Sequence, residues 1–359
     1  VLNDVNCTAA PDCAGLNRLE CEKTSNTCGS CLSSEYIGYE GDSSSLCVSV
    51  HNKPTTLTES TVGTCENDSE CSLFSECIGE MNNKTCVRLS ASCPGVDCSG
   101  SSQGRCWYLS VSTGLEISEC MQGDVSCTSK CSCLGNYTGD DCSLTYEELA
   151  LKVAMRDSVI SSFSTMTTQQ DPTFDNLQSW SNTVSSMAQA KSEVSSSSAE
   201  SIVNIVDTIF SNTESAGLSS DDLKGSLDAL DGVAGSSSVS ITQMNELVNN
   251  YGNLVSGEMI QGQATSNLIK GSFRLSSAVL ESNTGSNSDG NNRTLGITTP
   301  LSFVETLNKV EPMVINLPSD VDDNSGITMS STVMDAALYN NTKYNSNPLS
   351  LSLNKLPCE

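Results

Sequence analysis

Cysteines are the residues best suited to chemistry in this chain of 359 residues. Eighteen of the 19 lie between Cys7 and Cys142, at short and irregular spacing. Such a cluster can bind zinc or form disulfides, but zinc sites use repeated Cys-x2-Cys or Cys/His pairs. Cys28-Gly-Ser-Cys31 is the only Cys-x2-Cys here, and His51 is the only histidine. The pattern therefore predicts disulfides, a secreted chain and no resident metal.

The pairing of these cysteines stays open, because even six cysteines allow many connectivities. Cys358 stands far from the cluster, so it either pairs with a partner that the sequence does not reveal or joins two chains. The cysteines expected in disulfides are Cys7, Cys13, Cys21, Cys28, Cys31, Cys47, Cys65, Cys71, Cys77, Cys86, Cys93, Cys98, Cys106, Cys120, Cys127, Cys131, Cys133 and Cys142.

Asn-x-Ser/Thr triplets give a second chemical signal, since they accept N-glycans in secreted proteins. They occur in both halves of the chain, mostly in turn-like context. A disulfide at Cys7, inside the first triplet, can block that site. The asparagines are Asn6, Asn67, Asn83, Asn136, Asn292 and Asn340.

The charge balance excludes some classes of binding partner. The formal net charge is −26, and nucleic acids or anionic membranes need clustered Lys and Arg. The acidity indicates solubility through self-repulsion, with Ca2+ or a basic partner as the sharper alternative. No run of about 18 apolar residues exists, so we expect no membrane insertion by this chain. We also expect Val1 to follow a cleaved signal peptide.

Acidic residues could supply ligands or catalysis. The run 65–71 lacks the ligand spacing of a Ca2+ loop, so Ca2+ has no motif and no cofactor is expected. Acid pairs beginning at Glu147 and Asp221 fall in first turns of predicted helices, where the macrodipole favours negative charge. A third pair begins at Asp322, in a predicted loop. His51 lies in a Thr-rich linker, so no nucleophile with a base is expected and the chain is not predicted to be an enzyme.

Composition predicts a multidomain α+β chain of small disulfide-rich modules, a helical bundle and a β-sandwich. The expected segments are a cysteine-rich module at 1–50, a Thr-rich linker at 51–63, a second module at 64–92, a third at 93–142, a helical subdomain at 143–257 and a β-sandwich subdomain at 258–359.

The helical subdomain opens with a capping box, Thr145-Tyr-Glu-Glu148. Apolar residues then recur at steps of three and four, which predicts five amphipathic helices packed on one another. Their polar faces carry Ser, Thr, Asn and Gln, which fits a surface that is glycosylated or covered by neighbouring chains. The later helices are expected to begin near Pro172, Ser197, Ser219 and Ile241, and Gly232 with Gly235 is expected to end the fourth.

Period-two patterns then predict strands. One more is expected earlier, at Trp107–Val111. The later ones are Leu268–Leu275, Ser277–Leu280, Val310–Leu317, Gly326–Met329 and Leu349–Leu353.

The stretch 131–142 reads Cys-Ser-Cys-Leu-Gly-Asn-Tyr-Thr-Gly-Asp-Asp-Cys and resembles the C-terminal half of an EGF-like module. The stretch 93–106 is similar to the opening of such a module. Residues 107–126 depart from the family, because they insert extra sequence and Cys120. The residues before Cys93 lack the acidic consensus of calcium-binding members, so the resemblance does not imply calcium.

Residues 143–359, a Ser-rich helical segment followed by strands, resemble the GAIN-type domain of adhesion receptors and polycystin-like ectodomains. In that family a helical subdomain precedes a β-sandwich. The His-x-Ser/Thr turn at which the family cleaves itself is missing after Leu353. The resemblance therefore implies a truncated or non-cleaving version.

The combination of cysteine modules, Ser/Thr-rich sequence and glycan acceptors is also similar in modular style to protist mastigoneme proteins, which build flagellar hairs. We expect an extracellular structural or adhesive glycoprotein in a cell-surface assembly, for instance a mastigoneme-like filament. Its partners would be other extracellular proteins, including copies of itself, with N-linked and O-linked glycans. The alternative is the ectodomain of an adhesion or polycystin-like receptor, and a secreted hydrolase is more remote.

Overall fold

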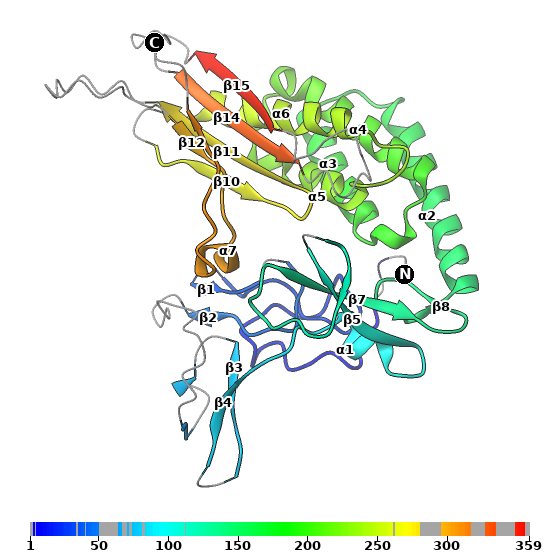
Figure 1. Cartoon of the computed structure of the whole chain (residues 1–359). Helices are drawn as coiled ribbons and strands as arrows, with labels where there is room; N and C mark the ends of the chain where they lie inside the picture. The colour runs from blue at the N-terminus through cyan, green and yellow to red at the C-terminus, as the bar shows by residue number, and fades with distance from the viewer. Residues whose placement is uncertain are drawn as a thin grey trace, which may run out of the picture. The chain divides into compact units, whose positions relative to one another are not determined.

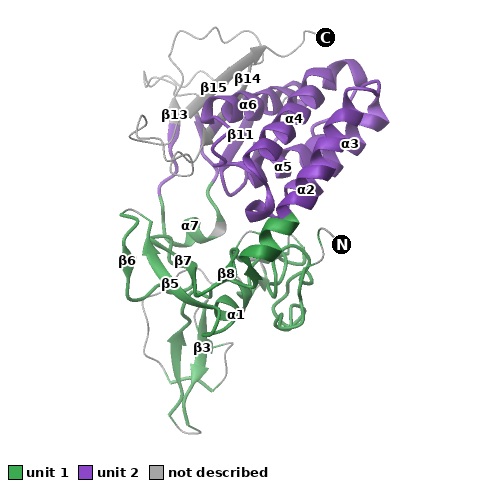
Figure 2. Cartoon of the chain, turned by 90° about the vertical axis from the view of Figure 1, so that its right-hand side faces the viewer, with its two compact units in different colours: residues 1–152, 301–310 green, residues 153–300, 311–359 purple. Residues whose placement is uncertain are grey.

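The chain is seen in a computed structural model that describes residues 3, 5–33, 35–39, 41–49, 64–66, 70, 71, 74–80, 83–111, 113–260, 263–280, 296–316, 327–334 and 349–355. It divides into two compact units (Figure 2). The cysteine-rich unit comprises Val1–Lys152 and Leu301–Val310. The helix–sheet unit comprises Val153–Pro300 and Glu311–Glu359.

Short strands make up most of the regular structure of the cysteine-rich unit. β5 pairs with β6 and β7 in a three-stranded sheet, and the remaining strands form two-stranded ladders. The predicted strand at Trp107–Val111 is confirmed, since it overlaps β5. The elements are β1 (Tyr36–Ile37), β2 (Val48–Ser49), β3 (Ser75–Ile78), β4 (Thr85–Arg88), α1 (Pro94–Ser99), β5 (Gly104–Ser110), β6 (Glu116–Ile117), β7 (Cys127–Cys133), β8 (Tyr137–Thr138), β9 (Leu144–Thr145) and α7 (Phe303–Leu307).

Nine disulfides join the eighteen clustered cysteines among the described residues, which confirms the disulfide prediction. Each bond stays within one of three stretches, 7–47, 65–86 or 93–142. They are Cys7–Cys21, Cys13–Cys28, Cys31–Cys47, Cys65–Cys77, Cys71–Cys86, Cys93–Cys106, Cys98–Cys131, Cys120–Cys127 and Cys133–Cys142. The chain is therefore a cysteine-rich protein of the extracellular type.

Helices come first in the helix–sheet unit, and the first of them, α2 (Tyr146–Thr167), begins in the cysteine-rich unit and passes into the helix–sheet unit at Val153. The capping box is confirmed, because Glu148 Oε2 accepts from the Thr145 backbone at 2.8 Å and Thr145 Oγ1 accepts from Glu148 N–H at 3.2 Å. The third helix begins earlier than predicted, with Ser195 as N-cap. The elements are α2 (Tyr146–Thr167), α3 (Phe174–Ala188), the 3-10 helix η3 (Lys191–Glu193), α4 (Ser196–Ala216), the 3-10 helix η4 (Asp221–Leu223), α5 (Lys224–Val233) and α6 (Ile241–Glu258).

The sheet of this unit has the order β10-β11-β14-β15 and is antiparallel throughout. The strands are β10 (Ser266–Ile269), β11 (Phe273–Leu280), β14 (Ile327–Met334) and β15 (Leu349–Lys355). β12 (Gly296–Thr298) pairs separately with β13 (Val314–Asn316). The predicted strand at Leu268–Leu275 is wrong, because residues 270–272 turn between β10 and β11. The carboxylate of Asp231 fixes that turn by accepting from Ser272 N–H at 2.7 Å.

Helices and sheet share one hydrophobic core. α6 packs on β11, β14 and β15 (Figure 1), and Phe273 and Leu275 of β11 are 2% exposed in the same core as Trp180 of α3. No described helix is long and apolar enough to cross a membrane.

Two glycines let α5 approach α3 closely. A Cβ at Gly225 would lie 2.6 Å from the Ser181 carbonyl oxygen, and one at Gly232 would lie 2.4 Å from that of Ala188. Gly232 was expected to end the helix, but it lies inside α5 and serves this contact. Of the two glycines expected to stop α5, Gly235 is the one that follows the helix, with φ near +82°.

The buried side of α2 agrees only in part with the apolar face that the steps of three and four predict over Leu149, Val153, Met155, Val159, Ile160 and Phe163. Ile160 is 0% exposed, as that face predicts, whereas Met155 and Val159 are 41% and 40% exposed and Arg156 is only 2% exposed. The reason is polar: the Arg156 guanidinium pairs with Glu193 at 2.7 Å, so the helix turns its arginine inward.

A polar cleft in the cysteine-rich unit

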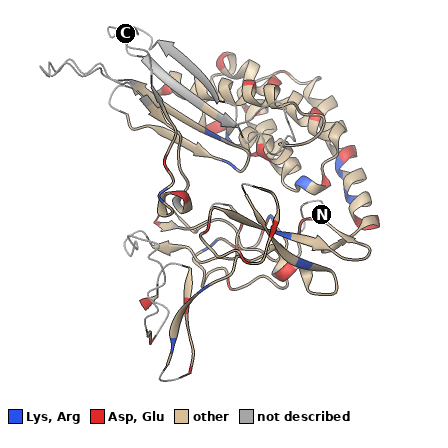
Figure 3. Cartoon of the chain, viewed as in Figure 1, with Lys and Arg blue, Asp and Glu red and all other residues tan. Residues whose placement is uncertain are grey.

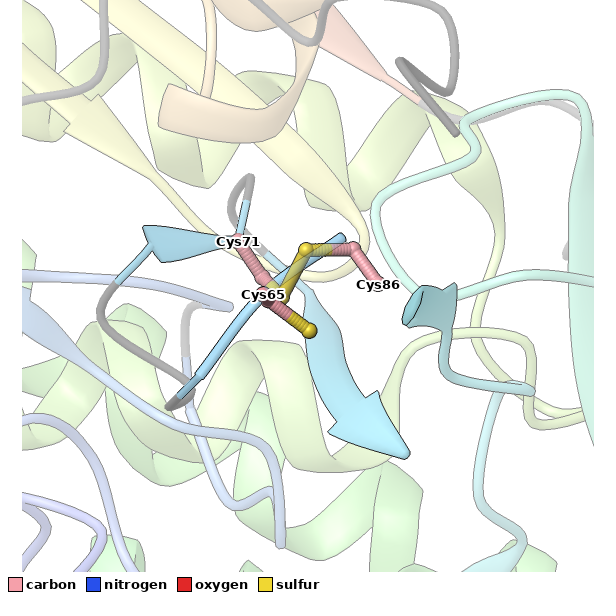
Figure 4. Close-up of side chains that lie close together, drawn as sticks. All are labelled: Cys65, Cys71 and Cys86. Carbon is pink, nitrogen blue, oxygen red and sulfur yellow. A yellow bond between two sulfur atoms is a disulfide. The ribbon is translucent and has the colours of Figure 1, made fainter. Parts of the chain in front are cut away.

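Three sulfur atoms approach within 4.8 Å of one another at two places among the described residues. One group is Cys65, Cys71 and Cys86, in which Cys71 is bonded to Cys86 (Figure 4) and Cys65 to Cys77. Zinc needs deprotonated thiolates, which disulfide sulfurs are not. The close sulfurs are therefore stacked disulfides. The same holds for the second group, Cys93, Cys98 and Cys131.

Arg18 is the polar centre of the first cysteine stretch and is only 1% exposed. Its guanidinium donates hydrogen bonds to four backbone carbonyls, named below, and to the Ser45 hydroxyl at 3.2 Å. Burial lowers the pKa of Arg18 from its ordinary value, and the charge of Asp42 opposes that shift. The guanidinium remains charged in water at any physiological pH. Its backbone acceptors are the carbonyls of Gly29, Tyr39, Gly41 and Ser45.

The loop that Arg18 fixes forms one wall of a cleft of about 430 Å³. The other wall comes from residues 91–94 and 120–129, within the same unit. Serine and threonine are the commonest residues in the lining. Among the described residues that line the cleft, three are aspartates and none is lysine, arginine or histidine. The aspartates are Asp42, Asp124 and Asp140.

Neighbouring hydroxyls orient two of these carboxylates. Thr24 Oγ1 donates to Asp42 Oδ2 at 2.8 Å. Ser126 donates to Asp124 Oδ1 through its hydroxyl at 2.7 Å and through its backbone N–H at 2.8 Å. Each of these bonds engages one oxygen of its carboxylate, Oδ2 of Asp42 and Oδ1 of Asp124.

Tyr39 joins the two walls, because its hydroxyl accepts from the backbone N–H of Gly123. Burial raises the pKa of Tyr39, while that hydrogen bond and the charge of Arg88 act in the opposite direction. Asp124 adds to the rise. The tyrosine therefore stays neutral and acts as a hydrogen-bonding strut.

Hydroxyls and carboxylates can bind a ligand through hydrogen bonds and charge. Carboxylates suit ammonium and guanidinium groups, and hydroxyls suit sugars or backbone amides. Acidic side chains are also spread over the described parts of both units (Figure 3). The cleft thus has the chemistry to bind a basic group.

The helix–sheet unit holds its own buried polar cluster. Arg156 pairs with Glu193 and also donates to the Met187 carbonyl at 2.8 Å. Asp157 accepts from the hydroxyl of Ser195 at 2.6 Å. These bonds tie α2 to the segment between α3 and α4. Sequence reasoning missed Arg156, because one arginine in an amphipathic helix is ordinarily placed in solvent.

Three predicted glycan acceptors, Asn6, Asn83 and Asn136, are exposed in the structure. Their glycosylation stays a prediction. Asn6 also accepts from the Thr8 hydroxyl at 2.8 Å. The acid pairs at Glu147 and Asp221 lie in first helical turns, as predicted. Outside the described residues lie His51, Asn67, Asn292, Asp322, Asn340 and Cys358.

Comparisons with known proteins leave the family open. No protein-family model matches the chain, and no curated protein is significantly similar to it.

Proposed function

We propose that this protein is a non-enzymatic, extracellular structural or adhesive glycoprotein that acts through protein–protein contacts in a cell-surface assembly. The single observation that carries the proposal is the set of nine disulfides over residues 7–142. Disulfides stabilise small modules that cannot bury a large core, which is the usual design of extracellular interaction domains.

The disulfide order supports an EGF-like module at 93–142. With Cys120–Cys127, which joins the insertion to the residue that follows it, set aside, the first cysteine pairs with the third, the second with the fourth and the fifth with the sixth. This interleaved order agrees with the resemblance of 131–142 to that family. The succession of helices and antiparallel strands supports a GAIN-like body over 143–359.

The partners follow from the surfaces. The cleft with Asp42 and Asp124 suits a lysine or arginine of another extracellular protein. Exposed Asn83 and Asn136 suit N-glycans. Serine- and threonine-rich helix faces suit O-glycans or neighbouring copies, as in a mastigoneme-like filament. No cofactor and no catalytic residue form part of the proposal.

Electron microscopy and sedimentation of the native, oxidised glycoprotein test this function. We expect concentration-dependent oligomers or filaments and no hydrolysis of a broad panel of peptides and glycosides. A chain that stays monomeric at high concentration and in the presence of Ca2+ would remove the filament proposal. Turnover in the hydrolase panel would instead support the secreted hydrolase.

A second function is favoured by the order of helices and strands in the helix–sheet unit. We propose as the alternative that the chain is the ectodomain of an adhesion or polycystin-like receptor. The coding sequence that follows Glu359 tests it: transmembrane segments there would decide for the receptor, and a stop codon would decide against it.

A further inference from the structure

Residues 301–310, here called the tip segment, belong to the cysteine-rich unit although they lie far along the chain. Figure 2 draws α7 in the colour of that unit. The segment is locally well specified. Ser302 and Glu305 form a capping box, in which Ser302 N–H donates to Glu305 Oε2 at 2.8 Å and Glu305 N–H donates to Ser302 Oγ at 3.2 Å. The tip is therefore a preformed helical turn.

The tip segment is seated in an apolar socket. We define the socket as Tyr39, Val48, Phe74, Gly123 and Val125. Val304 of the tip and Phe74 of the socket are each 5% exposed and form one hydrophobic cluster. The ring centroids of Tyr39 and Phe74 are 5.5 Å apart. The cluster thus joins the valine of the tip to aromatic residues from two different disulfide-bonded stretches.

Gly123 makes the socket specific. Its N–H donates to the Tyr39 hydroxyl, and its carbonyl accepts from Asn308 Nδ2 at 2.7 Å. Its φ is near +78°, and a Cβ there would lie 2.5 Å from the Phe74 ring. Gly123 therefore positions both aromatic residues of the socket and accepts a hydrogen bond from the Asn308 amide of the tip. The tip is recognised by an apolar side chain and a hydrogen bond together, as peptide ligands are.

The tip segment is carried on a β-hairpin stem. β12 and β13, which flank it, pair from Gly296↔Asn316 to Thr298↔Val314. Both strands are assigned to the helix–sheet unit, so the chain leaves that unit before the tip and returns after it. A preformed element on such a stem can be exchanged between identical chains at low cost, because every contact is already optimised. Met313 and Val314 of the stem are 48% and 56% exposed, away from the socket contact.

We propose that the tip segment is a ligand for the socket and that a second copy of this chain can supply it. The inference rests on the proposed self-assembly and deepens it, since it names the element and its receptor. A chain whose own tip is disabled presents an empty socket, and a chain whose socket is disabled presents an unused tip. Each of the two disabled chains therefore keeps the element, socket or tip, that the other chain has lost.

Complementation between two full-length chains tests the proposal. Val304→Asp disables the tip, Phe74→Ser disables the socket, and Val314→Asp is the matched control on the exposed stem. Native mass spectrometry and sedimentation should find Val304→Asp and Phe74→Ser each monomeric alone, whereas Val314→Asp should behave as the native chain does. When Val304→Asp and Phe74→Ser are mixed, we expect a heterodimer. It should be at least ten-fold more abundant than the homodimer in a sample of Phe74→Ser alone. Peptide mapping of the nine disulfides shows that both chains are folded.

A second measurement guards against misfolding of Phe74→Ser. A synthetic peptide of residues 299–312 should bind the full-length Val304→Asp chain, and the same peptide carrying Val304→Asp should not. Absence of both the heterodimer and peptide binding would overturn the proposal. If the native chain nevertheless assembled, the proposed function would stand without it. If heterodimers formed while the native chain stayed monomeric, the tip would be a ligand and the filament would be lost.

Discussion

The Asn308 amide donates to the carbonyl oxygen of Gly123 at 2.7 Å across 185 positions of sequence. Asn308 Nδ2 also donates to the Val304 carbonyl at 2.8 Å, so one side chain ends α7 and attaches it to the socket. Replacing Asn308 by Ala should lower the local free energy of opening by about 1 kcal/mol, the usual net value of such a bond. Hydrogen exchange at residues 121–125 measures the effect. Glu311→Ala, an exposed control, should leave exchange unchanged, and equal protection in both variants would contradict the expectation.

The buried pair of Arg156 and Glu193 predicts an asymmetric mutational result. Removing one partner leaves an uncompensated charge in the interior, which costs about 3–5 kcal/mol. Arg156→Met and Glu193→Leu should each destabilise the helix–sheet unit strongly, whereas the double variant should recover most of the loss. Urea unfolding followed by far-ultraviolet circular dichroism measures it. Additive losses would show that the two side chains do not act as a pair.

The α3–α5 contact predicts opposite signs for two glycine substitutions. Gly232→Ala places a methyl group 2.4 Å from the Ala188 carbonyl oxygen, and such overpacking costs about 1–3 kcal/mol. Gly257, inside α6, has no atom within 4 Å of its built Cβ. Gly257→Ala should stabilise by about 0.5–1 kcal/mol, because alanine is the better helix former. Thermal unfolding of both variants checks the contrast, and a stabilised Gly232→Ala chain would contradict it.

Reduction and chelation should affect the cysteine-rich unit differently. Each disulfide that constrains the unfolded chain contributes about 2–4 kcal/mol, so a strong reductant should unfold this unit. The helices α2 to α6 contain no cysteine and should keep their circular dichroism signal. A zinc chelator should change nothing, since every sulfur of the two close groups belongs to a disulfide. Loss of structure on chelation without reduction would favour a thiolate metal site instead.

Tyr251 predicts that the helix–sheet unit loses stability at alkaline pH. Desolvation, with the charges of Asp221 and Glu258, raises the pKa of Tyr251 to about 12 from 10.0. Below pH 10 both folded and unfolded states keep the proton, so stability is unaffected. Between pH 10 and 12 the unfolded state loses its proton first, and stability therefore falls as pH rises. Tyr251→Phe should flatten this part of the stability profile. Tyr146→Phe, which changes an exposed tyrosine, should not.

Local patterns predicted the features that depend on neighbours in sequence. Dense cysteines without Cys/His pairs predicted the disulfides, and Thr145 with Glu148 predicted the start of α2. Long-range features left no such trace. The inward side chain of Arg156 depends on Glu193, 37 positions away. The role of Gly232 depends on the backbone of α3. The turn at 270–272 depends on Asp231.

The candidate site shows the same division. The sequence indicated which cysteines are oxidised, but it gave no sign that Arg18 gathers backbone carbonyls or that Gly123 receives Asn308. Both features join residues that are unremarkable where they stand. From sequence alone, Arg18 and Gly123 look like ordinary residues of surface turns. Their roles depend on partners that only the fold brings close.

The nine disulfide loops span only 7 to 33 positions each. A chain that enters an oxidising compartment from its N-terminus can therefore close all of them before the helices emerge, since local contacts form early. The socket around Phe74 is different, because Val304, which covers it, is synthesised much later than the socket itself. During biosynthesis there is thus an interval in which the modules are complete and their apolar face is bare. In that interval a neighbouring nascent chain, or a folding helper, meets the surface that the finished protein hides.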